Sequence, residues 1–348
     1  MMVAVPVLLG SLMRIPLGWL TDRYGGCIVL SMIVIYTPLP LIALAIWHDA
    51  LSSMLLFGFL LGFTGASFAV GVPFVNGWYG TDRQGFALGV YGAGMGGTVV
   101  AGLTAPAIAD AWGLSAPFWF AAALVTTMAC VFWFFARDAA AVDSQAARKG
   151  MFSALSVFRG DSRAWALTLF YFLAFGGFVA MFLYLPKLLT AEFDLTKADA
   201  GARAAGFALL AVIARPIGGT LSDRIGAARV LSGCFMAVTL LAIGLAIGHL
   251  VMVPLTILCL TLAVALGLGT GAVFKLVPLW FPDRVGAVTG VVGAAGGLGG
   301  FFPPLIMGFV HTTIGSYSLG FALMALVALI SLLVLRGLHH AGPAPSGA

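Results

Sequence analysis

Charged residues are scarce in this chain. Only 8% of its 348 residues are Asp, Glu, Lys or Arg, whereas 61% are hydrophobic, and the mean hydropathy is +1.10. A soluble domain usually carries about 25% charged residues, and a soluble core cannot take up this much apolar surface. The composition therefore excludes a soluble globular protein and predicts a polytopic membrane protein.

Cysteine is scarce as well. Cys27, Cys130, Cys234 and Cys259 are scattered, without the spacing of a metal site or a disulfide framework. The apolar stretches contain no nucleophile–base pair and no cluster of metal-ligating residues. These absences argue against an enzyme and give no reason to expect a metal or a cofactor. The net charge of +5 is modest and gives no reason to expect a nucleic acid.

Long apolar runs are abundant, whereas the alternating ten-residue segments of a membrane β-barrel do not recur. The runs predict eleven helices, at 2–20, 27–46, 51–78, 85–109, 115–136, 164–190, 199–220, 229–249, 253–279, 286–311 and 317–336. Residues 137–163 are the one long polar stretch. We interpret them as a cytoplasmic linker between an N-terminal half, 1–136, and a C-terminal half, 164–348.

The two halves repeat each other at a constant offset of 201 residues. Asp22, Arg23 and Gly25 match Asp223, Arg224 and Gly226, and Gly89, Gly92 and Gly96 match Gly290, Gly293 and Gly297. Such repeats are typical of secondary transporters, whose substrate sites lie near the bilayer midplane between the repeats. The helix at 164–190 has no counterpart in the first half, so we expect a twelve-helix architecture that lacks its first helix here.

The distribution of basic residues predicts the orientation. If the central linker and every second loop lie on the same side of the membrane, that side carries most of the 17 Lys and Arg. Because cytoplasmic loops are enriched in Lys and Arg, this side is predicted to be the cytoplasm. The C-terminus then lies inside the cell.

Arg14 and Arg215 lie inside apolar stretches at matched positions of the repeat. A charge within a span costs at least about 2.5–3.5 kcal/mol, and a cost that occurs twice favours a function over snorkelling to the interface. Lys275 is a third cation deep in a predicted helix. Its counterpart is Phe74, so a role in the substrate pathway and a role in packing both remain open.

The 12 acidic residues fall in loops or at helix ends of this map. Three intramembrane cations without a buried counter-charge predict a site for an anion. A proton-coupled transporter often titrates an intramembrane carboxylate or histidine. The absence of one from the predicted spans favours anion exchange.

Two further motifs are duplicated. Gly-x-x-x-Asp-Arg-x-Gly occurs at 18–25 and at 219–226, and we interpret Asp22, Arg23, Asp223 and Arg224 as a conformational gate, because such residues pair with or cap neighbouring helix ends. Glycine-rich runs occur at 89–97 and 290–300. Their glycines permit close helix packing or expose backbone beside a small ligand; the signature positions are Gly89, Gly92, Gly94, Gly96, Gly293, Gly296 and Gly297.

These features resemble the major facilitator superfamily, and within it the nitrate/nitrite porter family. The glycine runs resemble the nitrate signature of that family's fifth and eleventh helices, and the stretch 175–186 resembles its helix seven. The resemblance covers essentially the whole chain. It implies an all-α polytopic membrane protein with the major facilitator fold of two pseudo-symmetric helical halves.

The resemblance also implies a substrate site. A planar anion is expected between Arg14 and Arg215, flanked by aromatic rings at Phe68, Tyr171 and Phe175. Guanidinium forks bind planar oxyanions in bidentate fashion, and Tyr171 and Phe175 are spaced i, i+4 on one helical face. This chain departs from the family at Met95, where the first signature usually has an asparagine.

We therefore expect a secondary transporter that exchanges nitrate and nitrite by alternating access in a bacterial-type inner membrane. A porter for another small anion, such as formate, oxalate or a monocarboxylate, is the alternative within transport. A non-transporting anion sensor or an inactive truncated paralogue is a further alternative. We expect a monomer whose partners are a small inorganic anion and the lipid bilayer.

Overall fold

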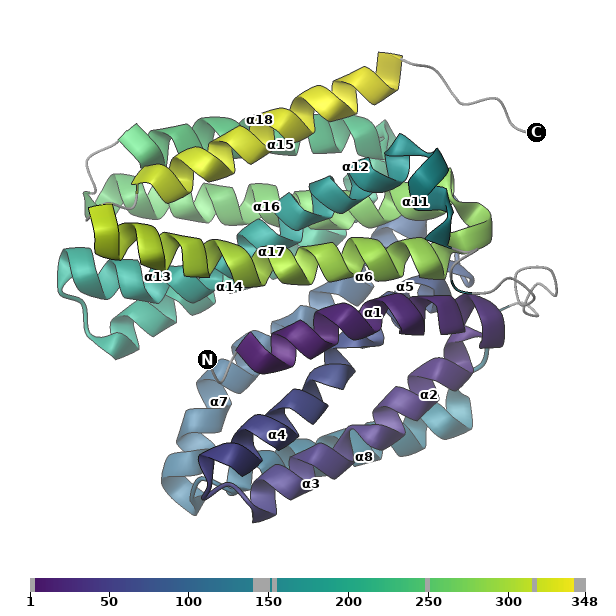
Figure 1. The fold of residues 1–348 in the computed structure, drawn as a ribbon, viewed down its shortest axis with the longest axis vertical. Helices are drawn as coiled ribbons and strands as arrows, with labels where there is room; N and C mark the ends of the chain where they lie inside the picture. The colour runs from purple at the N-terminus through teal and green to yellow at the C-terminus, as the bar shows by residue number, and fades with distance from the viewer. Residues whose placement is uncertain (1–3, 140–150, 152–154, 248–250, 315–317, 341–348) are drawn as a thin grey trace.

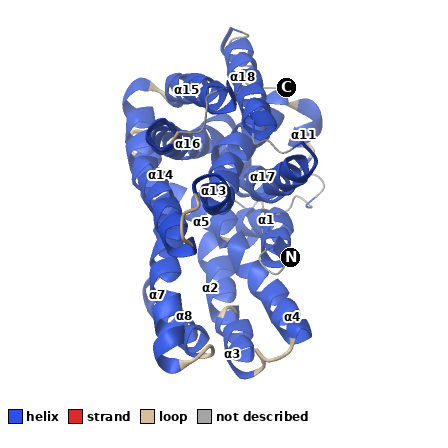
Figure 2. Ribbon diagram, turned by 90° about the vertical axis from the view of Figure 1, so that its left-hand side faces the viewer, coloured by secondary structure: helices blue, strands red, loops and turns tan. Residues whose placement is uncertain are grey.

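The computed structural model describes residues 4–139, 151, 155–247, 251–314 and 318–340. In this part of the chain every regular element is a helix, and no strand occurs (Figure 2). The predicted linker falls mostly outside these residues, since 140–150 and 152–154 are not among them.

The first half of the chain forms the lower group of helices in Figure 1. Its elements are α1 (Ala4–Tyr24), α2 (Gly26–Tyr36), α3 (Pro38–Ile46), α4 (Leu51–Gly62), η1 (Phe63–Ala66), α5 (Ser67–Asn76), α6 (Gln84–Ala93), η2 (Gly94–Gly96), α7 (Gly97–Trp112) and α8 (Ala116–Phe135). Several predicted helices are divided into shorter elements. At Thr37, for example, α2 gives way to α3, whose first residue is Pro38. Proline has no backbone N–H and suits the first position of a helix.

The second half forms the upper group. Its elements are α11 (Val157–Gly160), α12 (Ser162–Tyr171), η3 (Phe172–Gly176), α13 (Gly177–Phe193), α14 (Lys197–Ile225), α15 (Ala227–Ile247), α16 (Met252–Trp280), η4 (Pro282–Arg284), α17 (Val285–Ile314) and α18 (Ser318–His340). Helix α14 begins with a side-chain cap. The hydroxyl of Thr196 accepts a hydrogen bond from the N–H of Asp199, which satisfies one of the free donors at the helix start.

All eleven predicted helices are present, with ends that differ by a few residues. Ten helical segments among the described residues are long and apolar enough to cross a membrane. The remaining one, α1, packs along α17 of the other group. The prediction of a polytopic all-α membrane protein is confirmed.

The two groups meet along two pairs of helices, α1 with α17 and α14 with α6. Glycines at these contacts bring the backbones together. A Cβ atom added to Gly18 would overlap the carbonyl of Gly286, and one added to Gly219 would overlap the carbonyl of Gly85. These four glycines form two pseudo-equivalent contacts, because Gly18 matches Gly219 and Gly85 matches Gly286 at the repeat offset.

The last glycine of each Asp-Arg-x-Gly motif has a backbone conformation that favours glycine. The φ angles are 89° at Gly25 and 92° at Gly226. Because a Cβ atom disfavours positive φ, these angles explain why each motif ends in glycine. The sharp turn lets α1 and α14 end and the next helix begin within two residues.

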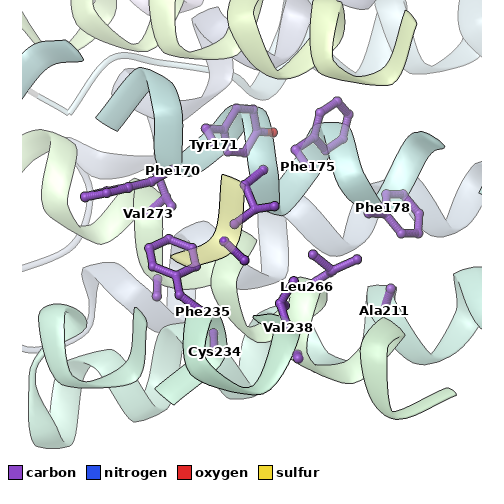
Figure 3. Packing of buried hydrophobic residues seen from close by; sticks show 14 of the residues in the cluster. Phe170, Tyr171, Phe175, Phe178, Ala211, Cys234, Phe235, Val238, Leu266 and Val273 are labelled. Carbon is purple, nitrogen blue, oxygen red and sulfur yellow. The ribbon is translucent and has the colours of Figure 1, made fainter. Parts of the chain in front are cut away.

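The larger buried core lies mostly in the second half and includes the helix that carries Tyr171 and Phe175 (Figure 3). Phe170 points away from these two rings toward Phe235, with ring centroids 5.2 Å apart. Tyr171 and Phe175 lie on the other side of the helix, where the ring of Tyr171 stacks on Phe68 of the first half. The core therefore fixes the helix that carries the predicted aromatic residues.

Candidate functional site

Arg215 lies near the middle of α14 and is only 2% exposed. Its Nη1 donates a hydrogen bond to the carbonyl of Gly92 on α6, with an N–O distance of 2.7 Å. Its Nε and Nη2 atoms are buried and have no hydrogen-bond partner among the described residues. An unpaired buried donor costs about 1–3 kcal/mol, and more when it is charged. The guanidinium therefore presents two unsatisfied donors to whatever occupies the space beside it.

Arg14 holds the pseudo-equivalent place on α1, eight residues before the motif aspartate and thus about 12 Å along the helix. Its Nη1 donates to the carbonyl of Gly293, and its Nε donates to the carbonyl of Gly65 at 3.2 Å. Gly293 matches Gly92 at the repeat offset. Each arginine therefore bonds the signature glycine of the opposite half. Of the two, only Arg215 has buried donors without a partner in the described part of the chain.

The ring of Phe175 lies beside both arginines. The guanidinium carbon of Arg14 and that of Arg215 are each 5.7 Å from the centroid of this ring. Arg215 also lies 5.2 Å from the ring centroid of Phe178. Cation–π contacts of this kind stabilise a guanidinium that has left water. They also hold both cations close to one ring, as the predicted site requires.

A small cavity opens beside Arg215, and its walls include Phe68 and Tyr171. The cavity offers about 10 Å³ to the centre of a water molecule, which is enough for about one water. The other residues of its wall are Leu88, Gly89, Gly92, Thr270, Gly271 and Phe274. Among the described residues that line it, Arg215 is the single charged side chain.

The rings around the cavity form one connected cluster. Phe68 and Tyr171 are nearly parallel, at 7° and 6.4 Å between centroids, and Tyr171 stacks on Phe175 at 5.1 Å. Phe274 meets Phe68 and Tyr171 edge-on, at 4.9 and 4.5 Å. Tyr91 stacks on Phe68 at 5.3 Å and donates its hydroxyl hydrogen to the carbonyl of Ser67.

Three of these aromatic residues were not predicted. Tyr91 lies inside the first glycine-rich run, and this place in the sequence could have identified it as a candidate site residue. Phe178 lies one turn beyond Phe175. Phe274 is adjacent to Lys275 in the chain, but nothing in the local sequence distinguishes it from a core phenylalanine.

The helix between Tyr171 and Phe175 differs from the prediction. The i, i+4 spacing predicts a regular α-helix, whereas residues Phe172–Gly176 form a turn of π-helix. Close packing accompanies this turn, since a Cβ atom on Gly176 would come 2.6 Å from the Cα of Gly299. Such turns occur frequently at functional sites. The wider turn still leaves the two rings parallel to within 3°.

The signature glycines divide into two groups. Most touch the site: a Cβ atom on Gly89 would come 2.7 Å from the carbonyl oxygen of Arg215, and one on Gly293 would come 3.1 Å from the Cδ of Arg14. Added Cβ atoms on Gly296 and Gly297 would overlap Tyr171 and Ser11. Gly94 differs, because a Cβ atom there would meet nothing within 4 Å.

The motif aspartates accept backbone hydrogen bonds from the opposite half. The carboxylate of Asp22 accepts from the N–H groups of Gly286 and Ala287, both at 2.8 Å, where α17 begins. Asp223 does the same where α6 begins, with the N–H groups of Gly85 at 2.9 Å and Phe86 at 2.8 Å. A carboxylate is favourable at the start of a helix. Arg23 instead lies over the ring of Trp19, at 5.3 Å, and Arg224 is exposed.

The structure corrects the expectation for Lys275. Its Nζ lies 2.7 Å from Oδ1 of Asp223, and the two side chains are 5% and 7% exposed. Lys275 also donates to the carbonyl of Thr81. The expectation that all three intramembrane cations lack a buried counter-charge is therefore wrong for Lys275. The sequence does not predict this contact, because Asp223 and Lys275 lie on different helices and Asp223 is expected at a helix end.

A larger cavity lies outside this site, between η3–α13 and α18. Its walls are apolar; they include Phe172, Met181, Phe321 and Met324. A cavity without charged or hydrogen-bonding groups does not hold an inorganic anion. The small cavity beside Arg215 is therefore the candidate anion site. In this conformation it has room for about one water molecule, so it must widen before an anion of three or four heavy atoms can enter.

Comparisons with known proteins identify the family of the chain. A family profile described as Major Facilitator Superfamily matches residues 1–274 and 187–348. The chain is 40% identical over 338 residues to the probable nitrate/nitrite transporter NarK2 of Mycobacterium tuberculosis, which covers 95% of this chain and 84% of that protein. It is 40% identical over 330 residues to the nitrite extrusion protein of Bacillus subtilis, covering 94% and 82%.

A further relative is the probable nitrate/nitrite antiporter NarK1 of Thermus thermophilus. It is 34% identical over 364 residues, with 95% of this chain and 80% of that protein covered. Among solved structures, the human organic anion transporter MFSD10 superposes with a TM-score of 0.78 at 16% identity, covering 96% of this chain and 82% of that one. At this identity the likeness concerns the fold.

Proposed function

The chain belongs to the major facilitator superfamily, and we propose that it is a secondary transporter that exchanges nitrate and nitrite by alternating access. The observation that carries the proposal is the buried guanidinium of Arg215: two of its donors have no partner among the described residues, and its side chain lines a cavity walled by aromatic rings. The relatives named for nitrate and nitrite support this choice of anion. Nitrate and nitrite are planar and small, and their oxygens match the fork of a guanidinium.

The charge balance of the site explains why it favours an anion. Arg14 and Arg215 both lie beside Phe175, and charges attract or repel more strongly where aromatic rings exclude water. Backbone carbonyls compensate each cation only in part. A bound anion supplies the missing negative charge, so it stabilises a conformation in which both arginines are enclosed.

Anion binding can be coupled to movement through the cross-half hydrogen bonds. The bonds from Arg215 to Gly92 and from Arg14 to Gly293 join one half to the other. An anion that accepts hydrogen bonds from both arginines replaces or reinforces these contacts. We therefore propose that the segments 1–136 and 164–348 rock against each other around the site.

The distribution of basic residues supports an orientation. We assign the side at which Asp22 and Asp223 lie, which we call the motif side, to the cytoplasm, together with the C-terminus. We propose that this membrane is the inner, or cytoplasmic, membrane of the cell. The hydrogen bonds of both aspartates across the two halves correspond to a conformation that is closed on the motif side.

The proposal is tested with purified protein in liposomes loaded with nitrite. We expect external nitrate to enter without an imposed pH gradient. A strict requirement for a proton gradient would contradict exchange and favour symport. Competition by formate, oxalate or a monocarboxylate at equal concentration, stronger than competition by nitrite, would identify another anion as the substrate.

The site is tested in the same assay with Arg14→Lys and Arg215→Lys. Lysine keeps the charge but lacks the planar fork, so both variants should exchange nitrate more slowly. Normal exchange by both variants would show that the site lies elsewhere. Nitrate binding to the wild type without any counterflow would indicate an anion sensor.

A further inference from the structure

Lys275 is the buried cation that the anion site leaves unexplained. It extends from α16 of the second half, and its Nζ contacts the carboxylate of Asp223 on α14. It also donates a hydrogen bond to the carbonyl of Thr81, which lies in the loop between α5 and α6 of the first half. One side chain thus joins two helices of its own half to a loop of the other.

This arrangement breaks the symmetry of the two motif contacts. Both aspartates accept two backbone hydrogen bonds from the opposite half. Asp223 has in addition a buried cationic partner, whereas Asp22 has no ion pair among the described residues. The position that matches Lys275 is Phe74, whose ring packs against Phe132 with centroids 5.8 Å apart.

The burial of the Lys275–Asp223 pair indicates which conformation of the protein the pair stabilises. The Asp223 carboxylate is 7% exposed while it bonds the start of α6, so its negative charge is removed from water only when the halves are closed on the motif side. A buried carboxylate needs a counter-charge, whereas a hydrated one does not. The cation of Lys275 therefore stabilises the closed conformation more than the open one.

We propose that Lys275 is a positioning residue that holds the motif side closed, by neutralising Asp223 and tying Thr81 to the second half. It acts through Asp223 and does not bind the transported anion. When the motif side opens, the bonds of Lys275 to Thr81 and of Asp223 to α6 break. The Lys275–Asp223 pair can persist, because both residues belong to the second half. This proposal rests on the alternating access of the proposed function but not on the identity of the anion.

The test measures opening of the motif side directly and needs no substrate. Thr270 lines the small cavity and is 4% exposed, and it lies on α16 five residues before Lys275. Thr270→Cys, in a background whose four native cysteines are replaced by alanine, gives a near-isosteric reporter. A membrane-impermeant thiol reagent is added to inverted vesicles and, for comparison, to right-side-out vesicles.

Lys275→Met should raise the labelling rate from the motif side at least severalfold, because the closed conformation then buries an uncompensated carboxylate. Lys275→Arg, which keeps the charge, should stay near the parent rate. The double variant Lys275→Met with Asp223→Asn removes both charges and should return the rate toward that of the parent. Phe74→Met is the matched control at the pseudo-equivalent position and should leave the rate unchanged.

The proposal is overturned if folded Lys275→Met protein labels at the parent rate. It is also overturned if Phe74→Met raises the rate equally, or if Lys275→Met weakens nitrate binding while labelling is unchanged, which would make Lys275 an anion ligand. If Lys275→Met alone does not fold, the double variant decides: a rate far above that of the parent contradicts a role through Asp223. Failure of nitrate exchange by the wild type would affect the proposed function and leave this test intact.

Discussion

Arg215 donates a hydrogen bond to the carbonyl of Gly92, and this 2.7 Å contact joins the second half of the chain to the first. Two buried donors of the same guanidinium have no partner among the residues that the structure describes. The bond to Gly92 orients the fork, and the unpaired edge is the part of the guanidinium that we expect to bind an anion. Arg14, its counterpart, already has both Nε and Nη1 bonded to carbonyls. The two arginines occupy matching positions of the repeat, but Arg14 donates two hydrogen bonds to carbonyls and Arg215 donates one.

We therefore predict that Arg215→Lys weakens nitrate binding more than Arg14→Lys does. Each hydrogen bond lost to a charged group is worth about 1.5–3 kcal/mol, or about 10- to 100-fold in Kd. Isothermal titration of nitrate into the purified proteins measures the difference. Equal losses, or a larger loss in Arg14→Lys, would contradict the assignment of Arg215 as the more available ligand.

Gly296→Ala should disturb the aromatic wall of the site. The added methyl group would overlap the ring of Tyr171 and come 3.1 Å from Phe175, and overpacking of this kind costs about 1–3 kcal/mol. We expect a lower Tm and weaker nitrate binding. Gly94→Ala is the matched control from the other signature run, because a Cβ atom there meets nothing within 4 Å. Similar behaviour of the two variants would argue against a packing role for Gly296.

Gly219→Ala should impair closure of the motif side. Its methyl group would overlap the backbone carbonyl of Gly85, and a backbone carbonyl cannot move aside as the end of a flexible side chain can. At a cost of about 1–3 kcal/mol, the closed conformation loses about 5- to 100-fold in population. Nitrate exchange should slow accordingly, whereas Gly233→Ala, with nothing within 4 Å, should exchange at the wild-type rate.

Asp223→Asn and Asp22→Asn should differ, although the two residues match in the repeat. Removing the charge of Asp223 leaves Lys275 buried without a counter-ion, and breaking a buried pair in this way costs about 3–5 kcal/mol. Asp22→Asn loses one acceptor for a backbone N–H, which costs about 1–3 kcal/mol. Thermal unfolding of both purified variants should therefore give the lower Tm for Asp223→Asn. The reverse order would mean that the ion pair contributes little.

The symmetric features were the most predictable from sequence. Apolar runs specify helices because a bilayer leaves no water to satisfy the backbone, and all eleven predicted helices are present. The repeat offset paired Arg14 with Arg215 and Gly92 with Gly293, and the structure joins each arginine to the glycine of the opposite half. The repeat in the sequence gives a repeat in the contacts, because residues at matching positions of the two halves contact partners that also match.

The asymmetric features could not be predicted in this way. The difference between the free edge of Arg215 and the engaged Arg14, and the π-helical turn between Tyr171 and Phe175, depend on how particular helices pack. The partner of Lys275 lies 52 positions away in the sequence, on another helix. The repeat offset shows only that Phe74 matches Lys275 in the sequence. It does not indicate which residues the lysine contacts.

The sequence alone therefore determined the membrane environment, the helices, the repeat and the presence of duplicated cations, because each follows from local composition or spacing. Only the tertiary structure decided which of the cations is free to bind an anion. That outcome depends on which carbonyl or carboxylate lies within hydrogen-bonding distance of each cation. For Arg14, Arg215 and Lys275 these partners come from other helices or, in the case of Thr81, from a loop, and the packing of the two halves brings several of them together.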